Sequence, residues 1–235
     1  MPNCNTSTLP IVLFDMDGTL LDLSFDDFIW NQCLPERHAK VHQCSLQQSH
    51  ETLSEFYQQH KHTLSWYSSD YWTAKVGVDV LKLQQEFQHK IQPRPGCFEL
   101  LEQLQEQGYR CWLVTNADQP SLKLKLENVA LRPYFEVIVS SQQLGFAKED
   151  IGFWQALQQL HGFNPTQVIL VDDTAQVLEG AKRFGIEQLI TITQPSSLKP
   201  ERDPSTLNYP AIANLIELLS FLAQFYVKDV DVKTA

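Results

Sequence analysis

The sequence lacks any apolar run of the roughly 18–20 residues that a helix needs to span a bilayer. Its first ten residues, MPNCNTSTLP, carry neither the basic cluster nor the apolar stretch of a secretory signal peptide. These two absences predict a cytoplasmic protein with no membrane partner.

Cysteine is scarce and scattered. The five cysteines are odd in number and include no Cys-x-x-Cys pair; they are Cys4, Cys33, Cys44, Cys97 and Cys111. Disulfide frameworks and zinc sites need paired, regularly spaced cysteines. We therefore expect reduced thiols and neither of those sites.

Basic residues are also in short supply. Lysine and arginine number 18 against 28 aspartates and glutamates, which gives a formal charge of −10. A nucleic-acid polymer needs clustered basic side chains, so we expect no such partner. A small phosphorylated substrate stays compatible with this charge, because one metal ion and one lysine can reverse the local field in an acidic protein.

Short continuous apolar runs alternate with helical patterns along the 235 residues. Runs typical of buried strands lie at Pro10 to Phe14, Tyr109 to Val114, Phe135 to Val139, Val168 to Val171 and, more weakly, Gln188 to Ile192. Helical patterns cover Glu99 to Gln107, Ser121 to Asn128, Asp150 to His161 and Ala175 to Phe184. This alternation indicates right-handed βαβ units and predicts a doubly wound, Rossmann-like α/β fold around a parallel sheet.

One region breaks the alternation. Residues 22–92 contain helical stretches and no convincing buried strand; the stretches are Phe25 to Cys33, Leu46 to Lys61 and Val78 to Lys90. Pro93 and Pro95-Gly96 then mark a boundary. We expect a core domain of residues 1–21 and 93–235, with residues 22–92 inserted after the first strand as a helical cap. Residues 194–210 are expected to form an irregular loop, and a last amphipathic helix is predicted over 211–225.

The sequence Asp15-Met16-Asp17-Gly18-Thr19 directly follows the first predicted strand. In open α/β sheets, ligands bind beyond the carboxyl ends of the strands. One carboxylate there can ligate a metal ion and attack phosphorus, while the other protonates a leaving group and then deprotonates water. A calcium loop is the alternative reading, but it needs a glutamate at its twelfth position, where Asp26 stands.

Three later segments add groups of the same kind. Thr115-Asn116 could hold a phosphoryl oxygen, although such a pair is more often a turn or a helix cap. Lys148 would on its own be read as a surface lysine. Asp172 and Asp173 close a buried run and invite a cation, since unpaired carboxylates there would repel each other; a helix cap is the alternative. Together, the four segments offer suitable groups in the order expected for phosphoryl transfer.

At these residues the sequence resembles the haloacid dehalogenase superfamily, in its phosphatase branch. The resemblance implies Asp15 as a nucleophile that forms an aspartyl-phosphate, Asp17 as general acid and base, Thr115 as a phosphoryl ligand and Lys148 as the neutralising cation. It implies Mg²⁺ held by the Asp15 carboxylate, the Asp17 carbonyl and Asp173, with Asp172 acting through a water. Many relatives have proline where Glu149 stands, a departure expected to affect only a loop.

A narrower resemblance concerns the segments LLDLSFDDFIW, HTLSWYSSDYW and GFAKED, which are similar to a bacterial GMP/IMP nucleotidase of this superfamily. It implies a purine nucleoside monophosphate as substrate, bound with the help of Asn116. Cap residues that could contact the base are His62, Trp66, Tyr67, Tyr71 and Trp72. The alternative for each ring is packing within the cap.

Other functions fit part of this pattern. A sugar-phosphate or phosphoglycolate phosphatase would keep every motif, and so would a phosphomutase. Haloacid dehalogenation would need neither Asp17 nor magnesium. A non-catalytic binding protein would need no intact set of motifs, which disfavours it here.

Overall fold

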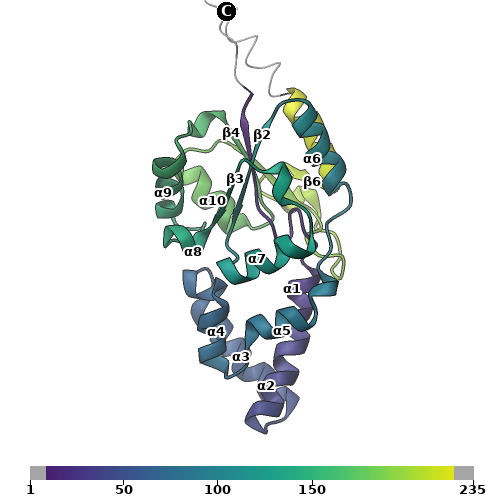
Figure 1. Ribbon diagram of the computed structural model, residues 1–235, viewed down its shortest axis with the longest axis vertical. Coiled ribbons are helices and arrows are strands. Elements are labelled where there is room, and N and C mark those ends of the chain that lie inside the picture. Colours follow the sequence, from purple (N-terminus) through teal and green to yellow (C-terminus); the bar gives the residue numbers. More distant parts are fainter. Residues whose placement is uncertain (1–8, 225–235) are drawn as a thin grey trace, which may run out of the picture.

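The computed structural model describes residues 9–224 as a parallel α/β sheet with helices on both faces (Figure 1). The sheet has six strands in the order β3-β2-β1-β4-β5-β6, and every pairing is parallel. The strands are β1 Ile11–Phe14, β2 Arg110–Thr115, β3 Val137–Ser140, β4 Val168–Val171, β5 Gln188–Ile192 and β6 Ala211–Ile212. The predicted doubly wound fold is confirmed.

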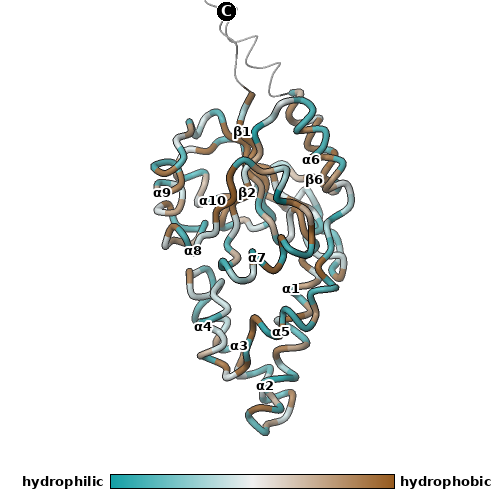
Figure 2. The backbone as a smooth tube through the Cα atoms, in the orientation of Figure 1, coloured by the Kyte–Doolittle hydropathy of each residue, from teal (hydrophilic) through white to brown (hydrophobic). Residues whose placement is uncertain are grey.

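The central strand β1 shows why both faces of the sheet need cover. All four of its residues are buried, and successive side chains point to opposite faces. Val12 and Phe14 pack in one cluster with leucines of α6 and α7, whereas Ile11 and Leu13 pack in another with α9 and α10. Figure 2 shows this concentration of hydrophobic residues along the strands.

The helices of the sheet layer lie close to their predicted positions. They are α6 Cys97–Glu106, α7 Gln119–Asn128, α8 Ser141–Leu144, α9 Ile151–His161 and α10 Ala175–Phe184. The short helix α8 had no counterpart in the sequence pattern. Gly185 ends α10 in the left-handed region at φ 114°, a conformation that glycine adopts at little cost.

The residues between β1 and α6 form a group of helices beyond one edge of the sheet, which we call the helical segment (residues 22–92; Figure 1). Its helices are α1 Ser24–Phe28, α2 Leu34–His42, α3 Leu46–His60, α4 Ser69–Val76 and α5 Val80–Glu86. The sequence pattern missed α2 and α4. In α2, Pro35 resembles a break, but it lies in the first turn, where proline is tolerated, directly after a π-helical turn at Ile29–Cys33.

Both ends of the helical segment leave the sheet layer at one place. The Asp22 amide donates to the Gln92 carbonyl at 2.9 Å, and Leu21 and Pro93 form an antiparallel bridge. The Arg94 amide donates to the Leu20 carbonyl at 2.8 Å. The two connections between the helical segment and the sheet layer therefore lie side by side.

The prediction of a helix beginning at Ala211 is wrong. Ala211 and Ile212 pair with Thr191 and Ile192 as strand β6. The helical turns start only after Asn214, whose side chain caps them by accepting from the Ile216 amide at 3.1 Å. The helical pattern of the following leucines was extended too far upstream, and its predicted end at residue 225 lies outside the described residues.

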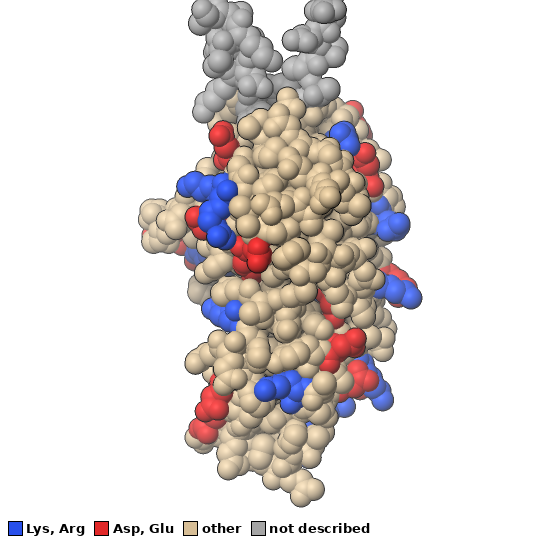
Figure 3. Space-filling view, turned by 90° about the vertical axis from the view of Figure 1, so that its left-hand side faces the viewer, with Lys and Arg blue, Asp and Glu red and all other residues tan. Residues whose placement is uncertain are grey.

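Three expectations from absences can be compared with residues 9–224. Cys33, Cys44, Cys97 and Cys111 are free thiols, while Cys4 lies outside that range. None of the helices within it is long and apolar enough to cross a membrane. On the face drawn in Figure 3, described lysines and arginines stand singly or beside acidic residues rather than in a continuous basic patch.

Candidate active site

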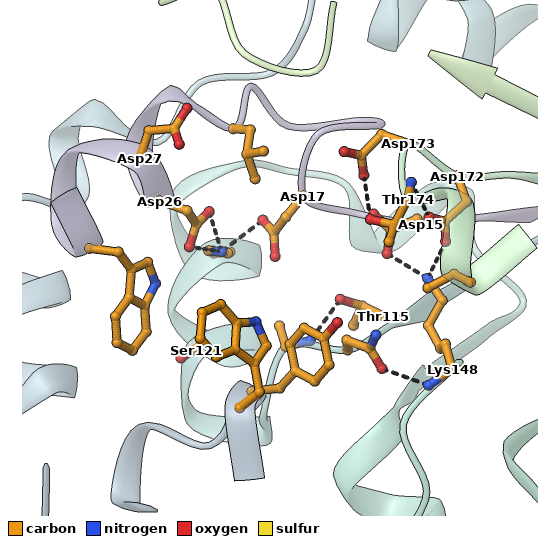
Figure 4. Close-up of a pocket in the computed structure, with 18 of the residues that line it drawn as sticks. Asp15, Asp17, Asp26, Asp27, Thr115, Ser121, Lys148, Asp172, Asp173 and Thr174 are labelled. Atoms are coloured by element: carbon orange, nitrogen blue, oxygen red, sulfur yellow. Dashed lines mark hydrogen bonds and ion pairs between the residues drawn. The ribbon is translucent and has the colours of Figure 1, made fainter. Parts of the chain in front are cut away.

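Four segments bring polar side chains to one edge of the sheet (Figure 4). Asp15 follows β1, Thr115 ends β2, Asp172 and Asp173 follow β4, and Lys148 lies in the loop after α8. Strand β1 lies between β2 and β4, and all three run parallel, so their carboxyl ends meet at the same edge. Residues far apart in the sequence are therefore neighbours here.

Lys148 is a buried cation and not a surface lysine, since only 1% of it is exposed. Its Nζ lies 2.6 Å from Asp15 Oδ1 and 2.6 Å from Asp172 Oδ2. Burial lowers the pKa of Lys148, but the charges of these two carboxylates outweigh that effect and leave the pKa above its usual value. The ammonium is thus held charged beside Asp15.

Thr115 and Asn116 organise the loops on either side of this lysine. Thr115 is buried and its Oγ1 accepts from the Ala117 amide at 3.0 Å. Asn116 Oδ1 accepts from the Lys148 amide at 2.9 Å, and its Nδ2 donates to Glu149 Oε2 at 3.1 Å. Asn116 therefore fixes the backbone from which the lysine side chain extends.

Asp15, Asp172 and Asp173 form a buried acidic cluster whose ligand atoms all lie within 4.8 Å of one another. Desolvation raises the pKa of Asp15 to about 6, and desolvation with repulsion from Asp172 and Asp15 raises that of Asp173 well above its usual range. Lys148 pairs with two of the three, and Arg202 Nη2 is 3.7 Å from Asp173 Oδ2. The cluster is thus short of positive charge at neutral pH.

The chain around this cluster fits a small divalent cation. Gly18, at φ +86°, passes so close that a Cβ on it would lie 2.7 Å from the Asp173 carboxyl carbon. Any residue other than glycine at this position would collide with the Asp173 carboxylate. Carboxylate oxygens are among the ligands that Mg²⁺ prefers, and the cluster supplies three carboxylates.

Asp17 points to a different partner, which the sequence pattern did not reveal. Its Oδ1 lies 2.7 Å from the Nζ of Lys125 on α7, and the same ammonium donates to both carboxylate oxygens of Asp26 on α1 at 3.0 and 2.9 Å. Lys125 follows the buried Leu122 by three residues, so it lies on the covered face of its helix. That spacing is the one signal in the sequence that could have identified it.

A cavity of about 330 Å³ lies between these residues and the helical segment. Asp15, Asp17, Thr115, Asn116 and Lys148 line one side of it. The aromatic residues that line it from the helical segment are Trp30, Tyr57, Trp66, Tyr67 and Trp72. The same segment also contributes polar residues to the lining: Asp26, Asp27, Asn31 and Gln84. The volume is in the range of small-molecule sites.

The aromatic side chains proposed from the sequence divide into two groups. Trp66, Tyr67 and Trp72 line the cavity, although Trp72 is only 1% exposed and also packs edge-to-face against its neighbours. Tyr71 and His62 are not among the lining residues. The Tyr71 hydroxyl instead pairs with His60 at 2.8 Å. Trp30 and Tyr57, which the sequence pattern did not single out, join the lining.

Glu149 links the sheet layer to the helical segment. Its carboxylate accepts from the Tyr67 hydroxyl at 2.5 Å, from Asn116 Nδ2 at 3.1 Å, and pairs with His62 Nδ1 at 3.3 Å. The expectation that a residue other than proline here affects only a loop was therefore too narrow. A glutamate at this position joins the loop of Lys148 to the wall of the cavity.

Comparison with known proteins agrees with this geometry. A family model described as haloacid dehalogenase-like hydrolase matches residues 12–191. Among characterised proteins, the GMP/IMP nucleotidase YrfG of Escherichia coli is 33% identical over 202 residues, which cover 84% of this chain and 91% of that protein. Residues 12–191, which the family model matches, include the cavity residues from both the sheet layer and the helical segment.

Solved structures show the same fold at lower identity. A HAD phosphatase from Thermococcus onnurineus has a TM-score of 0.74 at 23% identity and covers 91% of this chain and 98% of its own. A putative beta-phosphoglucomutase from Thermotoga maritima has a TM-score of 0.65 at 22% identity, with coverage of 92% and 99%. At these identities the likeness concerns the fold alone.

Proposed function

The chain belongs to the haloacid dehalogenase-like hydrolases and is a phosphatase of that family, and we propose that it is a magnesium-dependent 5′-nucleotidase for purine monophosphates such as GMP and IMP. One observation carries the proposal: a single cavity has Asp15 and Lys148 on one side and aromatic rings on the other. The similarity to a GMP/IMP nucleotidase over most of both chains supports the choice of substrate.

In the proposed reaction, an Asp15 carboxylate oxygen attacks the phosphorus in line with the 5′-oxygen. The bond from phosphorus to the 5′-oxygen breaks, and Asp17 gives its proton to that leaving oxygen. A water then attacks the phosphorus of the aspartyl-phosphate while Asp17 takes its proton, and the bond to Asp15 breaks. Lys148 stays beside Asp15 and offsets charge on the phosphoryl oxygens, which Thr115 also binds.

Mg²⁺ fits the acidic cluster in this scheme. Asp15 and Asp173 would hold it through carboxylates and Asp17 through its backbone carbonyl, with Asp172 acting through a water. When bound, Mg²⁺ supplies positive charge at the phosphoryl group. The shortage of positive charge among the three buried carboxylates supports this assignment.

We also propose that the helical segment is a cap domain with the boundaries 22–92, and that residues 1–21 and 93–235 form the core. The adjacent connections at Leu21 and Pro93 support that division. The aromatic rings of the cap would enclose the purine, and the cap would exclude bulk water while Asp15 is phosphorylated.

Phosphate release in Mg²⁺ across a panel of substrates tests the function. The panel contains GMP, IMP, AMP, CMP, UMP, glucose 6-phosphate, β-glucose 1-phosphate and phosphoglycolate. Preference for GMP and IMP is the expected result. Preference for a sugar phosphate or phosphoglycolate would refute the substrate and keep the chemistry. Conversion of β-glucose 1-phosphate to glucose 6-phosphate without net phosphate release would identify a phosphomutase.

Magnesium should stabilise the protein, and Asp173→Asn should remove that response. The substitution also relieves repulsion between Asp173 and its neighbours Asp15 and Asp172. Each kcal/mol of repulsion relieved should raise the unfolding temperature of the metal-free variant by about 2–4 °C relative to the wild type. Thermal unfolding with and without Mg²⁺ measures both effects. Glu187→Gln removes an exposed carboxylate as a control and should change neither. An Asp173→Asn protein that kept the full magnesium response would refute the assigned metal site.

Trp66→Leu should weaken nucleotide binding without impairing the chemistry. Base stacking on an aromatic ring contributes about 1–3 kcal/mol, so KM for GMP should rise by roughly ten-fold. The kcat for p-nitrophenyl phosphate, which has no purine, should not change. Tyr71→Phe is the matched control, because Tyr71 does not line the cavity. If kcat/KM fell equally for both substrates, Trp66 would only pack the helical segment.

A further inference from the structure

Lys125 is a buried cation whose contacts join three parts of the molecule. Only 3% of its side chain is exposed, although its backbone belongs to an ordinary helix at the surface of the sheet layer, α7. In Figure 4 the dashed lines from the labelled Asp17 and Asp26 converge on one nitrogen, and the ion pairs of these two carboxylates identify it as Lys125 Nζ. Asp17 comes from the loop after β1 and Asp26 from α1 of the helical segment.

A buried ammonium is costly unless it is paired, and two carboxylates pair with this one. Asp26 accepts through both carboxylate oxygens, at 3.0 and 2.9 Å, and Asp17 Oδ1 lies at 2.7 Å. Lys125 is not part of the cation pair at Asp15, where Lys148 already serves. The positive charge of Lys125 therefore acts on Asp17 and on Asp26, which holds the ammonium in place.

The contact fixes one oxygen of Asp17 and leaves the other available. Asp17 Oδ1 is buried against the ammonium, yet 19% of the Asp17 side chain stays exposed and lines the cavity. We propose that Lys125, clamped by Asp26, is a positioning residue that orients the Asp17 carboxyl so that Oδ2 faces the leaving oxygen and, later, the attacking water. This inference rests on the proposed function, in which Asp17 transfers those protons.

The role of Asp26 follows from its place on α1. Because Asp26 reaches Lys125 from the helical segment, the full set of contacts around Asp17 exists only while that segment lies over the sheet layer. Asp26→Asn should therefore act in the same direction as loss of Lys125, with a smaller effect, since one amide oxygen can still accept from the ammonium.

Two substrates separate positioning from a general structural role. The 5′-alcohol of GMP is a poor leaving group that needs a proton from Asp17, whereas p-nitrophenolate leaves without one. With Lys125→Met, kcat for GMP should fall about 100-fold or more, the range of general acid–base catalysis, while KM stays within about three-fold. With p-nitrophenyl phosphate, Asp15 should still be phosphorylated quickly. A burst of one nitrophenol per enzyme should precede slow turnover, because removal of the phosphate needs Asp17 as base.

The wild type, Lys123→Met and Lys125→Arg complete the experiment. Lys123 is an exposed lysine on the same helix, paired with the exposed Glu127, and its variant should behave as the wild type does. Lys125→Arg keeps the charge and should recover part of kcat. Asp26→Asn should show a smaller burst and serves as the test if Lys125→Met does not fold.

Three outcomes would overturn the inference. An equal loss on both substrates with no burst would make Lys125 merely structural. A raised KM for GMP at unchanged kcat would make it a substrate contact, and full activity of Lys125→Met would give it no role. A wild type that releases no phosphate from any substrate would instead refute the proposed function itself, so the two failures are distinguishable.

Discussion

Asp15→Asn is expected to lower phosphate release in Mg²⁺ by roughly four orders of magnitude or more. The amide is nearly the same size as the carboxylate but is a poor nucleophile, so no aspartyl-phosphate can form. The fold should survive, because Lys148 keeps its ion pair with Asp172 at 2.6 Å. The substitution also removes a buried carboxyl whose pKa desolvation raises to about 6. Steady-state phosphate release and circular dichroism measure the two expectations.

The covalent step can be observed directly with this variant. Wild-type protein quenched in acid during turnover of ³²P-labelled substrate should carry protein-bound phosphate, and the Asp15→Asn protein should carry none. Asp70→Asn, an exposed aspartate on α4, is the matched control and should match the wild type in both assays. If Asp15→Asn kept a tenth of the wild-type rate, Asp15 would not be the nucleophile.

Lys148→Met should affect both activity and stability. The variant leaves Asp15 and Asp172 buried without the ammonium that now lies 2.6 Å from each. Removing one partner of a buried ion pair typically destabilises a protein by about 3–5 kcal/mol. Loss of the charge beside the phosphoryl group should also lower kcat by about 1,000-fold. Urea unfolding and phosphate release measure these changes, with Lys82→Met, an exposed lysine on α5, as control.

The stability loss should depend on pH with a definite sign in the metal-free protein. Desolvation already raises the pKa of Asp15 to about 6, and Lys148 is the chief influence that lowers it. Without that lysine the pKa rises further. A carboxyl with a raised folded pKa destabilises the fold while ionised, so the deficit should be largest above about pH 7 and shrink toward about pH 4. A deficit that stayed constant over this range would show that packing, rather than charge, causes it.

The parts of the site that were predictable follow strands. Asp15, Thr115 and Asp172 each end or directly follow a buried apolar run, and parallel strands bring their carboxyl ends to one edge. Strand identity is readable because every residue of β1 and β4 is buried. Local sequence was therefore enough to predict these strands and the positions of Asp15, Thr115 and Asp172 at their ends.

The parts that were not predictable depend on how helices pack. The π-helical turn at Ile29–Cys33 changes the helical phase around Trp30, so a regular 3.6-residue pattern does not give the direction of its side chain. Lys125 and Asp26 are ordinary charged residues until α7 and α1 meet over Asp17. The role of Glu149 likewise depends on its hydrogen bond with Tyr67, which is 82 residues away in sequence.

The order of the strands in the sheet has a consequence for synthesis. The strand made first, β1, pairs with residues 110–113 on one side and 168–171 on the other. At about 5–20 residues per second, a ribosome needs roughly 8–30 s to proceed from β1 to the end of β4. The helical segment can form helices during that time, while the apolar residues Ile11–Phe14 wait for both partners and remain open to chaperones. The strand that leads into Asp15 is thus made before its neighbours but lacks its second partner until β4 has been synthesised.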